Sequence, residues 1–86
     1  MDNILTIKQN LANRVRKRRK EIKLSQLMLS CKSQVSLGSI KRFERSGEIS
    51  LSSLLRIAVV LDHGADFNQL FTRINYQSLD EIINAK

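Results

Sequence analysis

Apolar residues of this chain recur three or four positions apart, which is the spacing of one face of an α-helix. Ile7, Leu11 and Val15 follow one another at intervals of four, and Ile22 continues the stripe two turns later. No segment shows the alternation of apolar and polar residues that is typical of a half-buried strand. Because 86 residues are enough for one compact core, the pattern predicts a single all-α domain.

Small polar residues just before apolar runs supply start signals for helices, since their side chains cap free backbone amides. The cap candidates are Ser25, Ser36, Ser50 and Asp66. The apolar stripe predicts a first helix over residues 5–22, and these caps predict four more, over residues 26–32, 37–45 and 51–61 and from Asp66 to about residue 71, with a turn around His63 and Gly64. Ser78 and Glu81 have capping-box spacing and predict a short further helix. We therefore expect a domain over residues 1–73 and a tail over residues 74–86.

The residue inventory excludes several functional classes. The single Cys31 has no partner for an internal disulfide, which favours a reducing, cytoplasmic setting. No apolar run is long enough to cross a membrane, and the amino terminus does not predict a secretory signal. The one histidine, His63, lacks a metal-ligating cluster, and no glycine-rich loop is present. We expect no enzyme activity, no metal and no cofactor.

Positive charge is concentrated in the first half of the chain. Residues 1–45 hold 12 Lys and Arg against 3 Asp and Glu, a net charge of +9, whereas residues 46–86 carry −2. A strongly basic region of a folded domain indicates a polyanionic partner. The asymmetry predicts one nucleic-acid face and a second region with a different task.

The predicted third helix has two distinct sides. At about 100° per residue, one arc of roughly 140° collects Leu37, Gly38, Lys41, Arg42 and Arg45, opposite Ile40 and Phe43. An exposed helix face of this kind can enter a DNA major groove, where Lys and Arg donate to guanine and apolar groups touch thymine methyls. The predicted base-reading residues are Ser36, Leu37, Gly38, Ser39, Lys41 and Arg42.

Residues 11–61 resemble the lambda-repressor-like (Xre/Cro type) helix-turn-helix family. Leu24-Ser25-Gln26 is similar to the start of its second helix, residues 36–44 to its recognition helix, and Ser46-Gly47 to the following loop. The resemblance implies a five-helix DNA-binding domain, with an ion pair between Arg19 and Glu44. It also assigns a phosphate contact to Gln26, whose place at a helix amino end favours anions independently. The predicted phosphate-contacting residues are Gln26, Arg14, Arg16, Lys17, Arg18, Lys20, Lys23 and Arg45.

The chain departs from the family pattern at several positions. Gln34 and Lys23 stand where the family commonly has glycine, which predicts strain or a different turn shape. Leu27 and Met28 occupy commonly polar positions. Together with Cys31 they have two interpretations. They form an apolar surface for a partner, or they pack against the first or fourth helix of this chain, and we favour packing within the chain.

Surplus apolar residues near the carboxyl end predict protein contacts. The candidates for a dimer or partner contact are Leu70, Phe71, Leu79, Ile82 and Ile83. Helix-turn-helix domains usually bind palindromic sites as two-fold dimers, so we expect a homodimer. The whole chain is also similar to HipB-type antitoxin regulators encoded beside a HipA-type kinase, which implies a bacterial autoregulatory repressor that binds a kinase-like toxin. A basic RNA-binding or ribosome-associated protein is the alternative.

Overall fold

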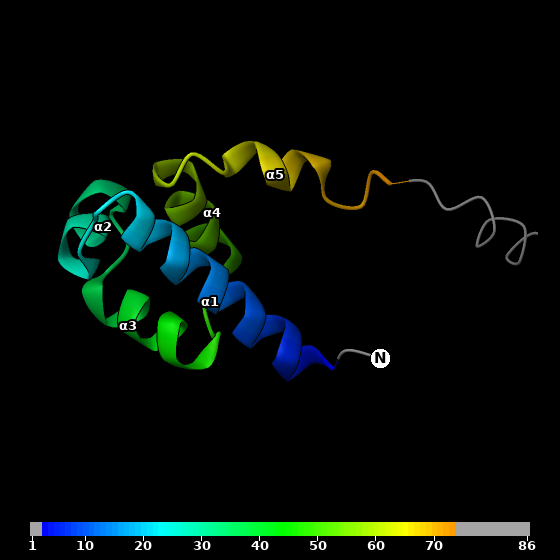
Figure 1. Cartoon of the computed structure of the whole chain (residues 1–86), viewed down its shortest axis with the longest axis horizontal. Coiled ribbons are helices and arrows are strands. Elements are labelled where there is room, and N and C mark those ends of the chain that lie inside the picture. Colours follow the sequence, from blue (N-terminus) through cyan, green and yellow to red (C-terminus); the bar gives the residue numbers. More distant parts are fainter. Residues whose placement is uncertain (1–2, 74–86) are drawn as a thin grey trace, which may run out of the picture.

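The structure is a computed structural model that describes residues 3–73 (Figure 1). These residues form an all-α fold of five helices: α1 (Ile4–Glu21), α2 (Gln26–Ser33), α3 (Leu37–Ser46), α4 (Leu51–Val60) and α5 (Gly64–Gln69). No helix in this part of the chain is both long and apolar enough to cross a bilayer. The helix predicted from Ser78, and the candidate contacts Leu79, Ile82 and Ile83, lie outside the described residues.

The first four helices each begin at a side chain that accepts a backbone N–H. Ser25 Oγ accepts from the amide of Met28 at 3.0 Å, and the hydroxyls of Ser36 and Ser50 make the same contact in α3 and α4. All three predicted serine caps are confirmed. In α1 the cap is Asn3, whose Oδ1 accepts from the Thr6 amide, so this helix begins one residue earlier than predicted.

The predicted start and end of the fifth helix are wrong. α5 begins at Gly64 and ends at Gln69, and Asp66 lies in its first turn instead of capping it. The amide of His63 donates to the Ala58 carbonyl at 2.8 Å, which closes the end of α4 and leaves room for a new helix immediately afterwards. Asp66 Oδ2 instead lies 2.8 Å from His63 Nδ1.

The helices enclose a core with two connected clusters. α1 packs across α3, and α4 packs on both α2 and α5 (Figure 1). One cluster comprises Leu29, Val35, Ile40, Ile57 and Leu61. The other comprises Ala12, Phe43 and Leu54, with the half-buried Phe67 of α5 packed against it. Val15 of α1 contacts both clusters, so α1 and α3 are held in a fixed relative orientation.

The amino-terminal end of α1 lies outside this core. Ile7, which the helical spacing predicts as a core residue, is 51% exposed, whereas Leu11 and Val15 pack inward. The prediction fails because α1 projects beyond the helices it packs against (Figure 1). Near this point Lys8 Nζ lies 2.7 Å from Glu48 Oε1, and this hydrogen bond lowers the pKa of the Glu48 carboxyl.

Lys23 and Gln34, for which the sequence predicts strain or a different turn shape, are among the non-glycine residues with a left-handed backbone, together with Asp62 and Phe71. Lys23 follows α1 and Gln34 follows α2, each with φ of 61°. The amide of Gln34 donates to the Ser30 carbonyl at 2.9 Å and closes the helix end. The turn between α2 and α3 therefore has the left-handed conformation that commonly ends helices, although glycine, which adopts it most easily, is not at this position.

Replacing Gln34 by Gly is expected to raise the free energy of unfolding by about 0.5–1 kcal/mol. The substitution relieves a left-handed strain of roughly 1–2 kcal/mol at a cost of about 0.5–1 kcal/mol in chain entropy. Urea denaturation followed by circular dichroism measures the change. Gln34→Ala is the matched control and is expected to be neutral. If the glycine variant is less stable than the alanine variant, the left-handed conformation of Gln34 is not strained.

Candidate nucleic-acid interface

The third helix presents a basic outer face and an apolar inner face, as its spacing predicts. Ile40 and Phe43 are fully buried, with exposed fractions of 0% and 1%. Lys41, Arg42 and Arg45 are exposed on the other side. One face of α3 therefore packs in the core, and the cations on its opposite face are accessible along the helix.

Gly38 lies at the second position of α3 and is exposed. Its φ is not positive, and a Cβ atom added there would meet nothing within 4 Å. Neither the backbone conformation nor the packing of the protein therefore requires glycine at this position. A glycine in a helix interior costs stability, so its presence is consistent with close approach of another molecule to the α3 backbone.

The two serines at the start of α3 bond to each other. Ser36 Oγ accepts from the Ser39 amide at 3.1 Å and donates to Ser39 Oγ at 2.8 Å. Ser39 is half-buried, as is Leu37. Of the six predicted base-reading residues, Ser36, Gly38, Lys41 and Arg42 are exposed. Ser36 is at the same time the predicted cap of α3.

The ion pair implied between Arg19 and Glu44 is present and buried. Arg19 Nε and Nη2 donate to the two carboxylate oxygens at 2.8 and 2.9 Å, so the contact is bidentate. Arg19 Nη1 also donates to the Leu24 carbonyl at 2.8 Å. The side chains are 9% and 6% exposed, respectively. This network ties α1 to α3 and to the connection that leads into α2.

Gln26, the first residue of α2, belongs to the same network. Its Nε2 donates to Glu44 Oε1 at 3.1 Å, while the residue stays half-buried. An amide nitrogen carries two hydrogens, so Nε2 has a second N–H to donate. Glu44 of α3 thus fixes the side-chain amide for which the sequence predicts a phosphate contact.

A shallow hollow brings together residues of three helices around Gln26. It is lined by Arg16, Arg19, Ser25, Gln26, Lys41, Glu44 and Arg45. Four cationic side chains therefore surround one carboxylate at the amino end of α2, where helix amides favour an anion. Lys41, predicted for base reading, lies among the phosphate candidates here. Ser25 was identified only as a helix cap, although its place beside Gln26 is a signal for this site.

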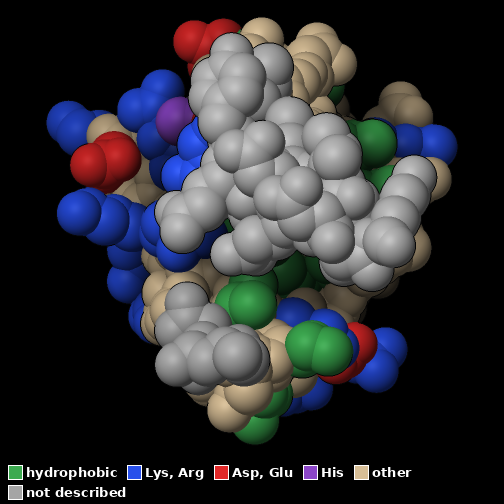
Figure 2. All heavy atoms as spheres, turned by 90° about the vertical axis from the view of Figure 1, so that its right-hand side faces the viewer, with side chains coloured by type: hydrophobic (Ala, Val, Ile, Leu, Met, Phe, Trp, Pro, Cys, Tyr) green, Lys and Arg blue, Asp and Glu red, His purple; other side chains and the backbone are tan. Residues whose placement is uncertain are grey.

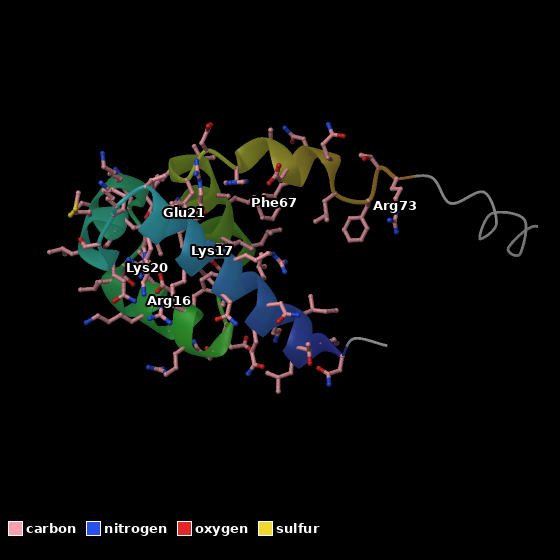
Figure 3. The ribbon with its side chains drawn as sticks, in the orientation of Figure 1. Arg16, Lys17, Lys20, Glu21, Phe67 and Arg73 are labelled. Carbon is pink, nitrogen blue, oxygen red and sulfur yellow. The ribbon has the colours of Figure 1, made fainter. Side chains whose placement is uncertain are left out.

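The predicted phosphate-contacting cations of α1, and Lys23 just after it, are distributed over different surfaces. Arg16, Lys17 and Lys20 line a second hollow along α1, and all three are exposed (Figure 3). Arg14 and Lys23 are exposed but line neither hollow.

Arg18 is the predicted phosphate contact that the structure directs elsewhere. Its side chain is half-buried, and its Nε donates to the Leu61 carbonyl at 3.2 Å. Arg18 therefore braces the carboxyl end of α4 and does not line the hollow around Gln26.

The favoured packing interpretation for the outer side of α2 is wrong. Leu27 and Met28 are 59% and 47% exposed, and Cys31 is also exposed. These residues point away from the clusters that α2 forms through Leu29. In the described part of the chain, no group of His, Cys, Asp or Glu side chains is arranged to hold a metal ion.

No protein-family model, curated protein or solved structure matches this chain.

Proposed function

We propose that this protein is a sequence-specific repressor that binds double-stranded DNA. The observation that carries the proposal is the two-sided α3, buried through Ile40 and Phe43 and exposing Lys41, Arg42 and Arg45 beside the hollow at the start of α2. An α-helix fits the major groove, where Arg donates two hydrogen bonds to guanine O6 and N7. Arg42 is the residue best placed to do so.

Phosphate contacts beside α3 supply the sequence-independent part of the affinity. Their candidates are Gln26, Arg16 and Arg45, which line the same hollow. Neutralising phosphates releases condensed counterions, so binding is expected to weaken steeply as the salt concentration rises. Arg19 contributes indirectly, because its guanidinium is occupied by Glu44.

The finer parts of the proposal concern the partners. We propose a homodimer on a palindromic operator that represses its own gene in the bacterial cytoplasm, and a kinase of the HipA type as a toxin partner. Leu70 and Phe71, both exposed after α5, support a protein contact in this region. Co-purification of a larger kinase-like protein would separate the antitoxin from a repressor that acts alone.

Selection of bound duplexes from a random pool, followed by sequencing, tests the proposed function. We expect a palindrome whose half-sites are about 34 Å apart, one helical turn. A parallel selection from random RNA tests the alternative of an RNA-binding protein. Enrichment of RNA without enrichment of any duplex would reject the repressor.

Gly38→Ala is expected to stabilise the protein and to weaken its binding to the selected operator. The methyl group favours the helix by about 0.5–1 kcal/mol and meets no protein atom. On the DNA it would separate the helix backbone from the bases, with an expected loss of about tenfold, or about 1.4 kcal/mol. Thermal denaturation and fluorescence anisotropy measure the two effects.

Ser52→Ala is the matched control for this glycine, because Ser52 is also exposed and also lies at the second position of its helix. This change is expected to leave operator affinity as it is. An unchanged affinity of the Gly38 variant would remove this part of α3 from the interface.

A further inference from the structure

Large apolar side chains are exposed at one end of the molecule. In the described part of the chain, exposed apolar side chains occur on the first two turns of α1, at the start of α4 and just after α5. They are Ile4, Leu5, Ile7, Leu51, Leu70 and Phe71. Phe71 is 96% exposed. The amino end of α1 and the carboxyl end of α5 extend toward the same end of the molecule (Figure 1). Figure 2 faces this end, and several hydrophobic side chains reach the surface there.

The exposed part of α1 is the continuation of its core-facing stripe. Ile4, Ile7, Leu11 and Val15 are three or four residues apart and so share one helix face. Leu11 packs on the cluster that also contacts Phe67. The apolar surface is therefore continuous with the core, and a molecule that covered Ile4 and Ile7 would extend this cluster.

The same end carries little charge. Residues 3–13 contain one charged side chain, Lys8, which is paired with Glu48 at 2.7 Å. Residues 49–55 contain none, and residues 64–73 contain Asp66, beside His63, and the exposed Arg73. Residues 14–23, in contrast, hold seven Lys and Arg. The cations of the first three segments are Lys8, which is paired with Glu48, and the exposed Arg73, so two copies of the chain bring fewer like charges together here than along residues 14–23.

The size of the surface suits a dimer. Six large side chains, each more than half exposed, present on the order of 600 Å² of surface, against about 800 Å² per partner in a standard interface.

We infer that this end binds a second copy of the chain through a two-fold contact, in which Ile4 and Ile7 of α1 are central. The inference rests on the homodimer proposed above and adds α1 to the interface, where the sequence suggested the fifth helix and the carboxyl-terminal tail. In a two-fold interface the same patch is used by both copies. The cations of Arg16 to Lys23 and the outer face of α3 stay uncovered for DNA.

The test compares the full chain with the double variant Ile4→Lys/Ile7→Lys by sedimentation equilibrium. We expect the wild-type chain to be dimeric at micromolar concentration and the variant to dissociate at least 100-fold more readily. Because both residues are exposed, the helical signal in circular dichroism is expected to be unchanged. Leu27→Lys/Met28→Lys is the matched control, since it places the same charges on exposed apolar residues of α2, and is expected to leave the dimer intact.

Three results would overturn the inference: a monomeric wild-type chain, an α1 variant that dimerises as tightly as wild type, or equal weakening by the α2 control. A separate DNA-binding measurement distinguishes failure of this interface from failure of the proposed repressor function. The α1 variant should bind a single half-site as tightly as wild type but lose the gain in affinity from the full palindrome. If neither protein binds any duplex while only the α1 variant loses the dimer, the repressor is rejected and the interface stands.

Discussion

Arg19→Met is expected to lower the free energy of unfolding by about 3–5 kcal/mol, because it removes the bidentate partner of the buried Glu44 carboxylate and leaves it the exposed Arg16, whose Nε is 4.0 Å from Oε1. The Leu24 carbonyl loses its donor in the same step. Domains of this size have a total stability of only about 4–13 kcal/mol. The variant is therefore expected to be partly unfolded at 37 °C, as measured by urea and thermal denaturation.

Two comparisons isolate the cause of this loss. Arg19→Met/Glu44→Leu removes both charges and is expected to recover a large part of the stability, since no uncompensated carboxylate remains buried. Lys8→Met breaks the exposed pair with Glu48 and is expected to cost much less, because water screens that pair. If the Lys8 and Arg19 variants lose equal free energy of unfolding, burial of the Arg19–Glu44 pair is not the cause of the loss.

Arg42→Ala is expected to weaken binding to the selected operator by about 10- to 100-fold, or about 1–3 kcal/mol, with a much smaller loss on random DNA. Arg42 is exposed on the outer face of α3, where a bidentate contact with guanine discriminates between base pairs. Anisotropy titrations on operator and random duplexes at the same salt concentration measure both losses.

Arg56→Ala is the matched control for this prediction. Arg56 is an exposed arginine of α4, outside both α3 and the hollow around Gln26. Its replacement also removes one positive charge, but it is expected to leave the preference for operator over random DNA unchanged. Equal losses for Arg42→Ala on both duplexes would assign Arg42 to phosphate contact and remove it from base reading.

The local features of the fold are predictable because they depend on neighbouring residues. Ser25, Ser36 and Ser50 cap their helices with the hydrogen bonds that serine makes to free amides, whatever packs nearby. The two sides of α3 follow from helical periodicity alone. In the candidate site, the exposure of Lys41 and Arg42 opposite the buried Ile40 is therefore evident without any tertiary information.

Other features depend on where one helix ends relative to another. Periodicity places Ile7 with Leu11 and Val15, but α1 extends past its neighbours and leaves Ile7 exposed. Arg18 lies in a basic run that favours phosphate contact, and yet its Nε reaches the Leu61 carbonyl of α4. Local spacing contains no information on which neighbour is within reach, so these assignments required the packed structure.

The sequence by itself determined that this chain is all-helical and that the third helix has a basic outer side, because caps and the 3.6-residue period are local properties. Only the tertiary structure decided which side chains of different helices meet. It joined Arg19, Gln26 and Glu44 into one buried network, and it left the first turns of α1 uncovered. These outcomes depend on helix length and crossing geometry, which are set by the packing of the whole core and not by any one segment.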